Sequence, residues 1–437
     1  MTTLTLHNAR LICPATGMDS QQSLRIEHGK IIALGAAAQA AFPTQAADTV
    51  NTVIDATGCV LAPGLIDLSV RLREPGYEYK NAMHTELRAA VAGGVTTVVC
   101  PPDTDPVLDE PGLVEMLCHR AQAIALAQVL PLGALTVQLK GAELSEMAAL
   151  QTAGCTAFSQ GGMPLADTQV LARALNYAKS FNLTVWLRPV DARLAGGVAA
   201  SGAYATRMGL SSVPVAAESI ALLTVFELLR SNPTPVHIQC LSSARGVELV
   251  RAAKAEGLPV TCDVSAYHLH FCDTDIGHFD ALMRFEPPLR SSRDRAALRA
   301  ALADGTIDAV CSDHTPVDAD EKLLPFAQAS AGASGVELLL SMALQWAVQD
   351  RVALSTVMAR LSTGGAAALR RPAPKLALGE AADLVLFKPD AWQRVGALHS
   401  QGQNTPFAGM ELPGVVCATW VGGRLVYAAP QQGLVLG

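Results

Sequence analysis

Residues 63–76 have the sequence PGLIDLSVRLREPG, in which an apolar run gives way to alternating polar side chains. Alternate residues of a strand point the same way, so a strand end of the form Asp-x-His-x-His-x-Arg supplies two imidazole nitrogens to zinc. Here the spacing is kept, but Ser69 and Arg71 stand in the two histidine positions. A serine hydroxyl is a poor zinc ligand at neutral pH, and a guanidinium has no free lone pair and a permanent positive charge. Chemistry that needs this metal cannot use this strand.

The composition indicates a compact, soluble protein with a large core. The chain has 437 residues, of which 50% are hydrophobic and 16% are charged, which suits one large barrel with an appended domain. The formal net charge is −7, and the basic residues form no cluster. Neither a nucleic acid nor an anionic membrane surface is therefore an expected partner.

The sequence shows no targeting feature. The first residues, Met1 to Leu6, lack the positive and apolar regions of an export signal, and no run of about 18 apolar residues indicates a membrane span. The ten cysteines are scattered without a Cys-x-x-Cys pair, as is typical of small core residues in a reducing compartment. We therefore expect a cytoplasmic protein.

The two ends of the chain predict short antiparallel strands. Apolar and polar residues alternate over 4–26, before a turn at 28–29, and again over 383–387 and 418–427, around a Gly-Gly hairpin at 422–423. Two β-rich ends that flank a different middle indicate one small β-sandwich domain built from both chain termini.

The middle of the chain repeats short apolar runs followed by amphipathic helical stretches, which is the alternation of a βα barrel. Helices are expected over 143–153, 167–181 and 242–255. The eight strand candidates are 65–70, 95–100, 129–135, 156–159, 183–188, 236–240, 260–264 and 307–312. The predicted fold class is α/β, a (β/α)8 TIM-like barrel over residues 62–371, with residues 1–61 and 372–437 forming the β-sandwich domain. Because parallel strands end at one mouth of a barrel, chemistry is expected just after each strand.

Several separated stretches carry a specific family resemblance. They are 63–76, 92–106, 143–159, 285–290, 305–316 and 404–407. On these stretches, and over nearly its full length, the chain resembles a dihydroorotase of the amidohydrolase superfamily. The resemblance implies a binuclear zinc site in a barrel mouth, which hydrolyses or closes the cyclic amide of dihydroorotate in pyrimidine synthesis.

Most of the metal ligands that the resemblance implies are replaced. The replaced positions are Ser69, Arg71, Gln160, Arg188 and Cys240. Gln160 stands where a bridging carboxylate is implied, and a neutral amide cannot replace a bridging anion. Only Asp313 keeps the family identity, and in active members that aspartate resembles a metal ligand and general base combined. Without the metals, water stays a weak nucleophile, so we expect no metal at these positions, no cofactor, and a vestigial Asp313.

The implied substrate pocket is also altered. Arg73, which resembles the arginine that grips the substrate carboxylate, is kept. Asp103 and Glu286 stand where asparagines are implied, and Val317 replaces a histidine. Two new carboxylates would repel a dianionic carbamoyl aspartate, so Arg73, Asp103 and Glu286 are expected to form a vestigial pocket.

The new arginines suggest that charge replaces metal in the mouth. Paired buried charges tolerate desolvation far better than lone ones. We therefore expect the guanidiniums of Arg71 and Arg188 to neutralise nearby carboxylates. The candidate carboxylates are Asp67, Asp103, Glu286 and Asp313.

Two other interpretations concern the retained polar residues. Asp313 and His314 are also what a strand-end turn needs, as a capping carboxylate and a packed imidazole. A relocated zinc site is the second interpretation, since Cys, His and Asp are all good ligands. Its candidate ligands are His237, His268, His270, Cys240 and Asp313.

Two Ala/Gly-rich stretches are expected to be flexible. Residues 328–335 resemble the mobile loop that covers the site in active relatives, and with nothing to cover they suit a flexible linker. Residues 194–208 suit a disordered excursion. Either stretch could instead be ordered by a partner.

The sequence favours a catalytically inactive dihydroorotase homologue that acts as a structural subunit. The resemblance is to inactive homologues that assemble with aspartate transcarbamoylase, which makes that enzyme the expected partner and places the chain in UMP biosynthesis. A homo-oligomer is also possible. One alternative is a dihydroorotase-type cyclic amide hydrolase with a degenerate or relocated metal site, holding zinc at reduced occupancy. Another is a ligand sensor that uses Arg73 as an anion anchor.

Overall fold

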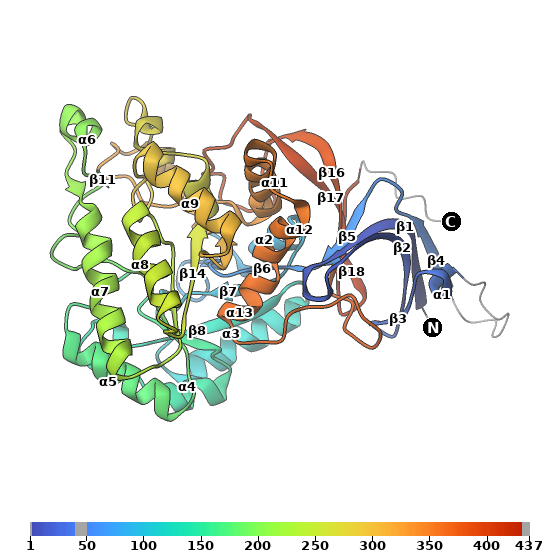
Figure 1. The fold of residues 1–437 in the computed structure, drawn as a ribbon, viewed down its shortest axis with the longest axis horizontal. Helices are drawn as coiled ribbons and strands as arrows, with labels where there is room; N and C mark the ends of the chain where they lie inside the picture. The colour runs from blue at the N-terminus through green and yellow to red at the C-terminus, as the bar shows by residue number, and fades with distance from the viewer. Residues whose placement is uncertain (1, 40–49, 431–437) are drawn as a thin grey trace.

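The computed structural model describes residues 2–39 and 50–430. Its larger part is a barrel of parallel strands, and a separate sheet lies at one end of the molecule (Figure 1). The eight barrel strands, paired in chain order, are β6 (Leu65–Asp67), β7 (Val95–Cys100), β8 (Gln128–Ala134), β9 (Ala157–Ser159), β10 (Val185–Leu187), β13 (Val236–Ile238), β14 (Val260–Ser265) and β15 (Ala309–Cys311). All eight strands expected from the sequence are present.

The barrel closes between the extensions of its first and last strands. A parallel bridge joins Val70 to His314, the Arg71 N–H donates to the His314 carbonyl at 3.0 Å, and the His314 N–H donates to the Ser69 carbonyl at 2.9 Å. The barrel is therefore closed by the strand end that carries Ser69 and Arg71, where the resemblance implies two metal ligands. This places Ser69 and Arg71 beside Asp313.

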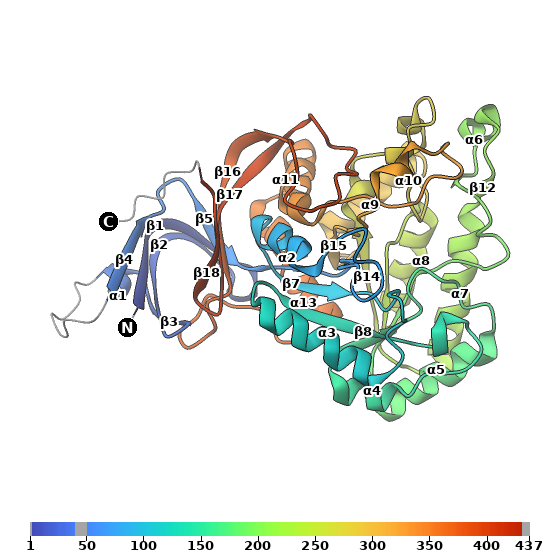
Figure 2. The same cartoon turned by 180° about the vertical axis from the view of Figure 1, so that it is seen from behind.

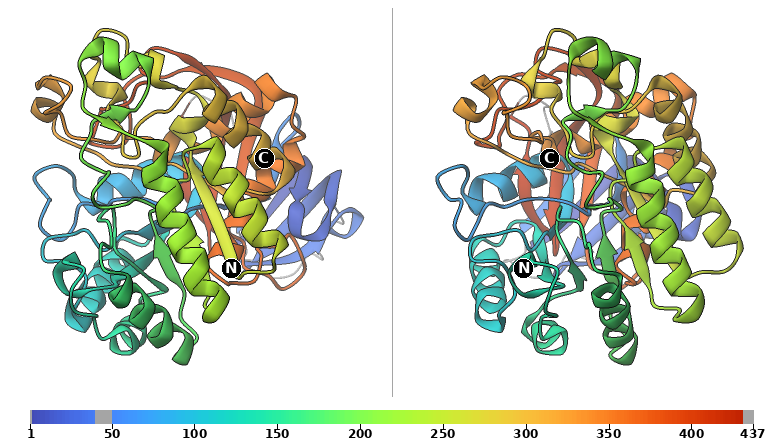
Figure 3. Two further views of the ribbon diagram at one scale, coloured as in Figure 1. Left: turned by 60° about the vertical axis from the view of Figure 1, so that its left-hand side comes forward. Right: turned by 90° about the vertical axis from the view of Figure 1, so that its left-hand side faces the viewer.

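Helices cover the outside of the barrel, and α7 and α8 lie side by side there (Figures 2 and 3). The main helices are α2 (Met83–Ala92), α3 (Pro111–Ile124), α4 (Met147–Ala153), α5 (Thr168–Ser180), α7 (Val215–Ser231), α8 (Ala244–Ala255), α9 (Ser292–Asp304), α11 (Leu339–Asp350), α12 (Leu354–Leu361) and α13 (Thr363–Ala368). Asp167 and Ser243 cap α5 and α8 by accepting backbone N–H groups, which fixes where these helices begin. The predicted helices are confirmed, although α4 begins later than expected.

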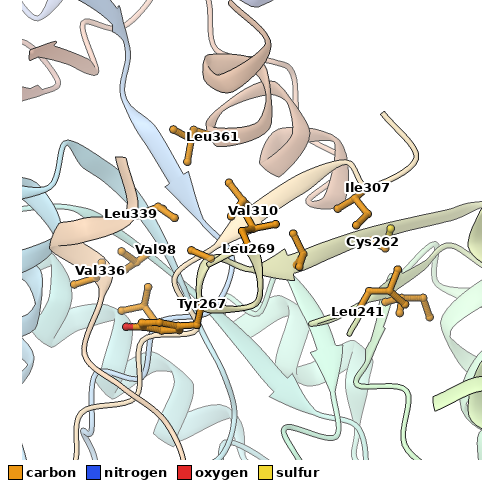
Figure 4. Packing of buried hydrophobic residues seen from close by; sticks show 14 of the residues in the cluster. Val98, Leu241, Cys262, Tyr267, Leu269, Ile307, Val310, Val336, Leu339 and Leu361 are labelled. Atoms are coloured by element: carbon orange, nitrogen blue, oxygen red, sulfur yellow. The ribbon is translucent and has the colours of Figure 1, made fainter. Parts of the chain in front are cut away.

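A large apolar cluster fills the layer between the barrel strands and their helices (Figure 4), and a second, smaller cluster lies within the barrel and includes Val99, Leu132 and Trp186. Val98, Tyr267 and Val310 come from different parts of the chain and are each fully buried in the large cluster. Such a core stabilises the barrel independently of any metal. Within the two described ranges, no helix combines the length and apolar character needed to cross a membrane.

The chain termini build a second sheet, as predicted. Its strands are β1 (Thr2–Cys13), β2 (Met18–Glu27), β3 (Lys30–Leu34), β4 (Val50–Asp55), β5 (Val60–Pro63), β16 (Leu384–Arg394), β17 (Glu411–Val421) and β18 (Arg424–Ala428). Glu27 pairs with Lys30 and Val421 with Arg424, so both predicted turns are confirmed. Leu24 and Trp420 belong to a buried apolar cluster of this sheet's own.

The two Ala/Gly-rich stretches are ordered, which corrects the sequence prediction. Residues 328–335 run along the end of β15, where the Thr315 N–H donates to the Ala333 carbonyl at 2.8 Å. The stretch 194–208 contains β11 (Ala199–Ala200), which pairs with β12 (Ser212–Val213), and α6 (Ala203–Met208). Contacts within the chain are sufficient to order both stretches.

Candidate functional site

The expected site residues do gather at the carboxyl ends of the barrel strands. Asp313 lies at their centre, where its Oδ1 accepts hydrogen bonds from Ser69 Oγ at 2.9 Å, Arg71 Nη1 at 3.3 Å and Arg188 Nη2 at 3.4 Å. Three positions where the resemblance implies metal ligands thus supply hydrogen-bond donors to the one retained carboxylate.

Arg71 links this carboxylate to a second one. Its Nε lies 2.8 Å from Asp103 Oδ2, and its Nη1 also donates to Thr315 Oγ1 at 2.9 Å. The side chains of Arg71, Arg188 and Asp313 are only 10–11% exposed, and that of Asp103 is 28% exposed. We refer to these two arginines and two aspartates as the charge quartet. Its formal charges cancel, so the prediction that arginines neutralise carboxylates is confirmed for Asp103 and Asp313.

The charge quartet keeps both of its carboxylates ionised. Burial alone would raise the pKa of Asp313, but the Arg188 and Arg71 guanidiniums outweigh it and hold that pKa below its ordinary value. Burial likewise opposes ionisation of Asp103, and Arg71 again holds the pKa below its ordinary value. A carboxylate with a lowered pKa is a weak base, so this environment does not favour proton abstraction by Asp313.

Among the described residues, neither of the other two candidate carboxylates forms an ion pair with Arg71 or Arg188. That part of the prediction is wrong for Asp67, whereas Glu286 is, after Asp313, one of the negative charges that raise the pKa of Arg188 against the effect of burial. Asp67 Oδ1 accepts the N–H groups of Ser312 at 3.0 Å and Ser69 at 3.3 Å, while its Oδ2 has no partner among the described residues. Burial raises the pKa of Asp67 to about 6. Glu286 is exposed and forms no hydrogen bond or ion pair with any residue in the described ranges.

Gln160 is held by its own surroundings. Its amide Nε2 donates to the Leu139 carbonyl at 2.7 Å, and its Oε1 accepts from Thr136 Oγ1 at 2.9 Å. The side chain is 2% exposed. Both ends of the amide are therefore occupied at the position where the resemblance implies a bridging anion.

The residues present do not fit the binuclear zinc site that the resemblance implies. A zinc ion needs lone pairs from thiolate, imidazole or carboxylate groups. At this site Arg71 and Arg188 place permanent cations within 3.4 Å of the remaining carboxylate oxygen. Ser69 and Gln160 provide no anionic ligand, so Cys240 is the one replaced position of the five that offers a metal-binding group.

Arg73 lies beside the charge quartet without joining it. Its Nε donates to the Pro316 carbonyl at 2.8 Å, and its guanidinium carbon lies 5.8 Å from the centre of the Tyr77 ring. Burial, together with the neighbouring Arg71 cation, lowers the pKa of Arg73. The geometry thus gives Arg73 a structural role in the mouth, and whether it still grips an anion stays a prediction.

The histidines proposed for a relocated zinc site are used elsewhere. His268 Nε2 lies 3.1 Å from the Pro287 carbonyl and His270 Nε2 lies 2.9 Å from the Met342 carbonyl, and burial lowers both pKa values to about 4. His237 lies 3.0 Å from Asp263. Within the described part of the chain, these histidines do not converge with Asp313 on a shared metal position.

His314 is packed as the structural interpretation expected. Its Nδ1 accepts the N–H groups of Gly335 at 3.0 Å and Val336 at 3.3 Å, so its Nε2 carries the proton that is donated to Glu86 Oε2 at 2.6 Å. The Ser400 hydroxyl donates to the same carboxylate at 2.7 Å. The role of Glu86 was missed from the sequence, where its one available signal is a charge among the apolar residues of α2.

Comparison with known proteins places the chain in a family. Residues 58–244 match the family model described as dihydro-orotase-like. The chain is 46% identical to the "Dihydroorotase-like protein" of Pseudomonas aeruginosa, covering 97% of this chain and 99% of that one. It is 36% identical to the "Dihydroorotase" of Pelobacter propionicus, with the same coverage.

A solved structure agrees with the barrel. The L-hydantoinase (dihydropyrimidinase) of Arthrobacter aurescens superposes with a TM-score of 0.85 and 22% identity, covering 99% of both chains. That likeness supports the fold alone. The sequence relatives extend over almost the whole chain. The chain therefore belongs to the dihydroorotase-like family of amidohydrolase-type proteins.

Proposed function

We propose that this chain is a catalytically silent dihydroorotase-like protein that serves as a structural subunit. The observation that carries the proposal is the charge quartet, in which Arg71 and Arg188 bind the carboxylate of Asp313. For active members of this family, the resemblance implies that a metal-activated water attacks the ring. Metal activation makes water a strong nucleophile at neutral pH. The quartet occupies the space and uses the lone pairs on which that activation would depend.

The substrate side supports the same proposal. Asp103 is ionised within the charge quartet. Glu286 is an exposed carboxylate that forms no ion pair among the described residues, although its charge acts on Arg188 and Arg284. Both stand where asparagines are implied in active relatives. A dianionic carbamoyl aspartate gains nothing from these two groups, so we infer that substrate binding was lost together with the metals.

The proposed partner is aspartate transcarbamoylase. The fold is kept over the full length of the family while the site is rebuilt, which is the pattern expected when a barrel is retained for the surface that it presents. Because the chain resembles inactive homologues that assemble with aspartate transcarbamoylase, we propose that it holds that enzyme's subunits together in the cytoplasm.

Co-expression of the tagged chain with aspartate transcarbamoylase from the same source tests this role. We expect the two proteins to co-elute from size-exclusion chromatography in a fixed ratio. We also expect the transcarbamoylase expressed alone to form smaller species with lower activity. The control is the same purification with an untagged chain. A transcarbamoylase that is fully assembled and active without this chain would contradict the scaffold role.

A further inference from the structure

A second cluster of metal-binding side chains lies beside the charge quartet. It consists of Cys240, just after β13, Asp263 on β14 and Cys311 on β15. One donor atom from each residue lies within 4.8 Å of the others. The three residues are 2%, 0% and 0% exposed, respectively. We refer to them as the thiol cluster.

We propose that the thiol cluster binds one thiophilic divalent ion of the zinc type. Two thiolates and a carboxylate are a favourable ligand set for such an ion. This proposal goes beyond the structural role proposed above and does not depend on it. Only Cys240 occupies a position at which the family resemblance implies a ligand, while Asp263 and Cys311 are specific to this cluster.

Asp263 is held in place for this role. Its Oδ1 accepts the Cys240 N–H at 2.6 Å, and its Oδ2 lies 3.0 Å from His237 Nε2. His237 is in turn fixed by Thr261, whose Oγ1 lies 2.8 Å from Nδ1. Each carboxylate oxygen retains a second lone pair. Hydrogen bonds from outside the ligand set that orient a carboxylate are a common feature of metal sites in proteins.

The strand arrangement favours a metal over a disulfide. β14 lies between β13 and β15. Two strands separated by a third lie roughly 9–10 Å apart, whereas a disulfide requires its Cα atoms to lie within about 7 Å. The two thiols approach each other because both side chains belong to the buried cluster within the barrel. An ion bound between the two thiols does not require the strands to move closer together.

Charge and access also suit a bound cation. Arg188 Nη2 lies 3.8 Å from Cys240 Sγ and 3.4 Å from Asp313 Oδ1, so its guanidinium contacts both the thiol cluster and the charge quartet. Arg188 is already balanced within the charge quartet, so two thiolates and one carboxylate bring three negative charges to a divalent ion. The occupied cluster keeps one net negative charge, which lies beside the Arg188 guanidinium. Cys240 and Arg188 also line a pocket, and Cys240 is the member of the thiol cluster that this pocket reaches.

Cadmium, which forms a sulfur-to-metal charge-transfer band in the ultraviolet, is the probe for the test. The reduced, chelator-treated full chain is titrated with Cd²⁺ alone, and we expect the band to saturate at one equivalent. Cys240→Ser and Cys311→Ser should each weaken binding by more than the roughly 10–100-fold that follows loss of an orienting residue. Cys262→Ser is the matched control, since Cys262 is equally buried on β14 and its thiol donates to the Thr306 carbonyl at 3.5 Å.

A second readout covers variants that fold poorly. Saturating Zn²⁺ should raise the unfolding temperature of the parent chain and of Cys262→Ser, because an ion that binds only the folded state stabilises it. A parent chain that shows neither the band nor the temperature shift overturns the proposal, whatever the variants do. A band that survives in both Cys240→Ser and Cys311→Ser also overturns it.

Discussion

Replacing Arg71 with alanine is expected to lower the free energy of unfolding by about 3–5 kcal/mol. The guanidinium is 11% exposed and contacts both Asp103 and Asp313. Asp313 would keep Arg188, but Asp103 would become a largely buried carboxylate without an ion-pair partner. The loss follows from that uncompensated charge, and it is measured by urea unfolding of the parent and the variant.

Two variants show whether charge is the cause. Arg245→Ala removes an exposed arginine from its pair with Glu248, where the side chains are 55% and 58% exposed, and should cost only about 0–1 kcal/mol. Arg71→Met combined with Asp103→Leu removes both charges and should recover most of the stability, since apolar replacement of a buried pair is often neutral. Equal losses for Arg71→Ala and Arg245→Ala would contradict the importance of the charge quartet.

Asp67→Asn is expected to become more stable relative to the parent as the pH rises from 4 to 7, by about 2 kcal/mol in total. The folded pKa of Asp67 is raised to about 6 by burial, whereas an unfolded aspartate titrates near about 3.9. Between these values the folded parent holds a proton that the unfolded chain has lost, so the parent loses stability as the pH rises. Asparagine does not titrate and escapes this loss.

The difference between parent and variant isolates this one group. Asp103 and Asp313 have lowered pKa values, so their contribution has the opposite sign and is lost as the pH falls through those values. Both carboxylates are present in parent and variant, and their effects cancel in the difference. Unfolding in urea at several pH values measures it. A difference that stays constant with pH would contradict the burial of an ionisable Asp67.

Much of the fold could be predicted because its signals are local. The strand predicted over 95–100 has the bounds that the structure gives β7, and the hairpin at 422–423 follows directly from its two glycines. Apolar runs and turn residues act over a few positions, so they are readable without a structure.

The Ala/Gly-rich stretch 328–335 was misread because small residues indicate close packing as well as flexibility. A Cβ on Gly335 would lie 2.1 Å from the Tyr267 hydroxyl, and one on Gly332 would lie 2.5 Å from Thr315. The glycines permit this approach of the chain to the barrel. Only the tertiary contacts distinguish that role from a linker.

The site could be predicted in outline but not in its pairing. The replaced positions at Ser69, Arg71 and Arg188 were identified from the family resemblance, and they do meet at Asp313. The arginines form ion pairs with Asp103 and Asp313 and not with the other two candidate carboxylates. This pairing depends on side-chain positions that local sequence does not specify. The Glu86–His314 contact joins residues 228 positions apart, and no local sequence pattern predicts it.

A dihydroorotase assay of the purified chain in zinc-supplemented buffer tests the central claim, that the charge quartet has replaced the catalytic metals. We expect dihydroorotate hydrolysis at the rate of the buffer with zinc alone, even when the thiol cluster is saturated with zinc. The contradicting result is zinc-dependent hydrolysis by the parent chain that disappears in Asp313→Asn, because that would make Asp313 a working ligand and base.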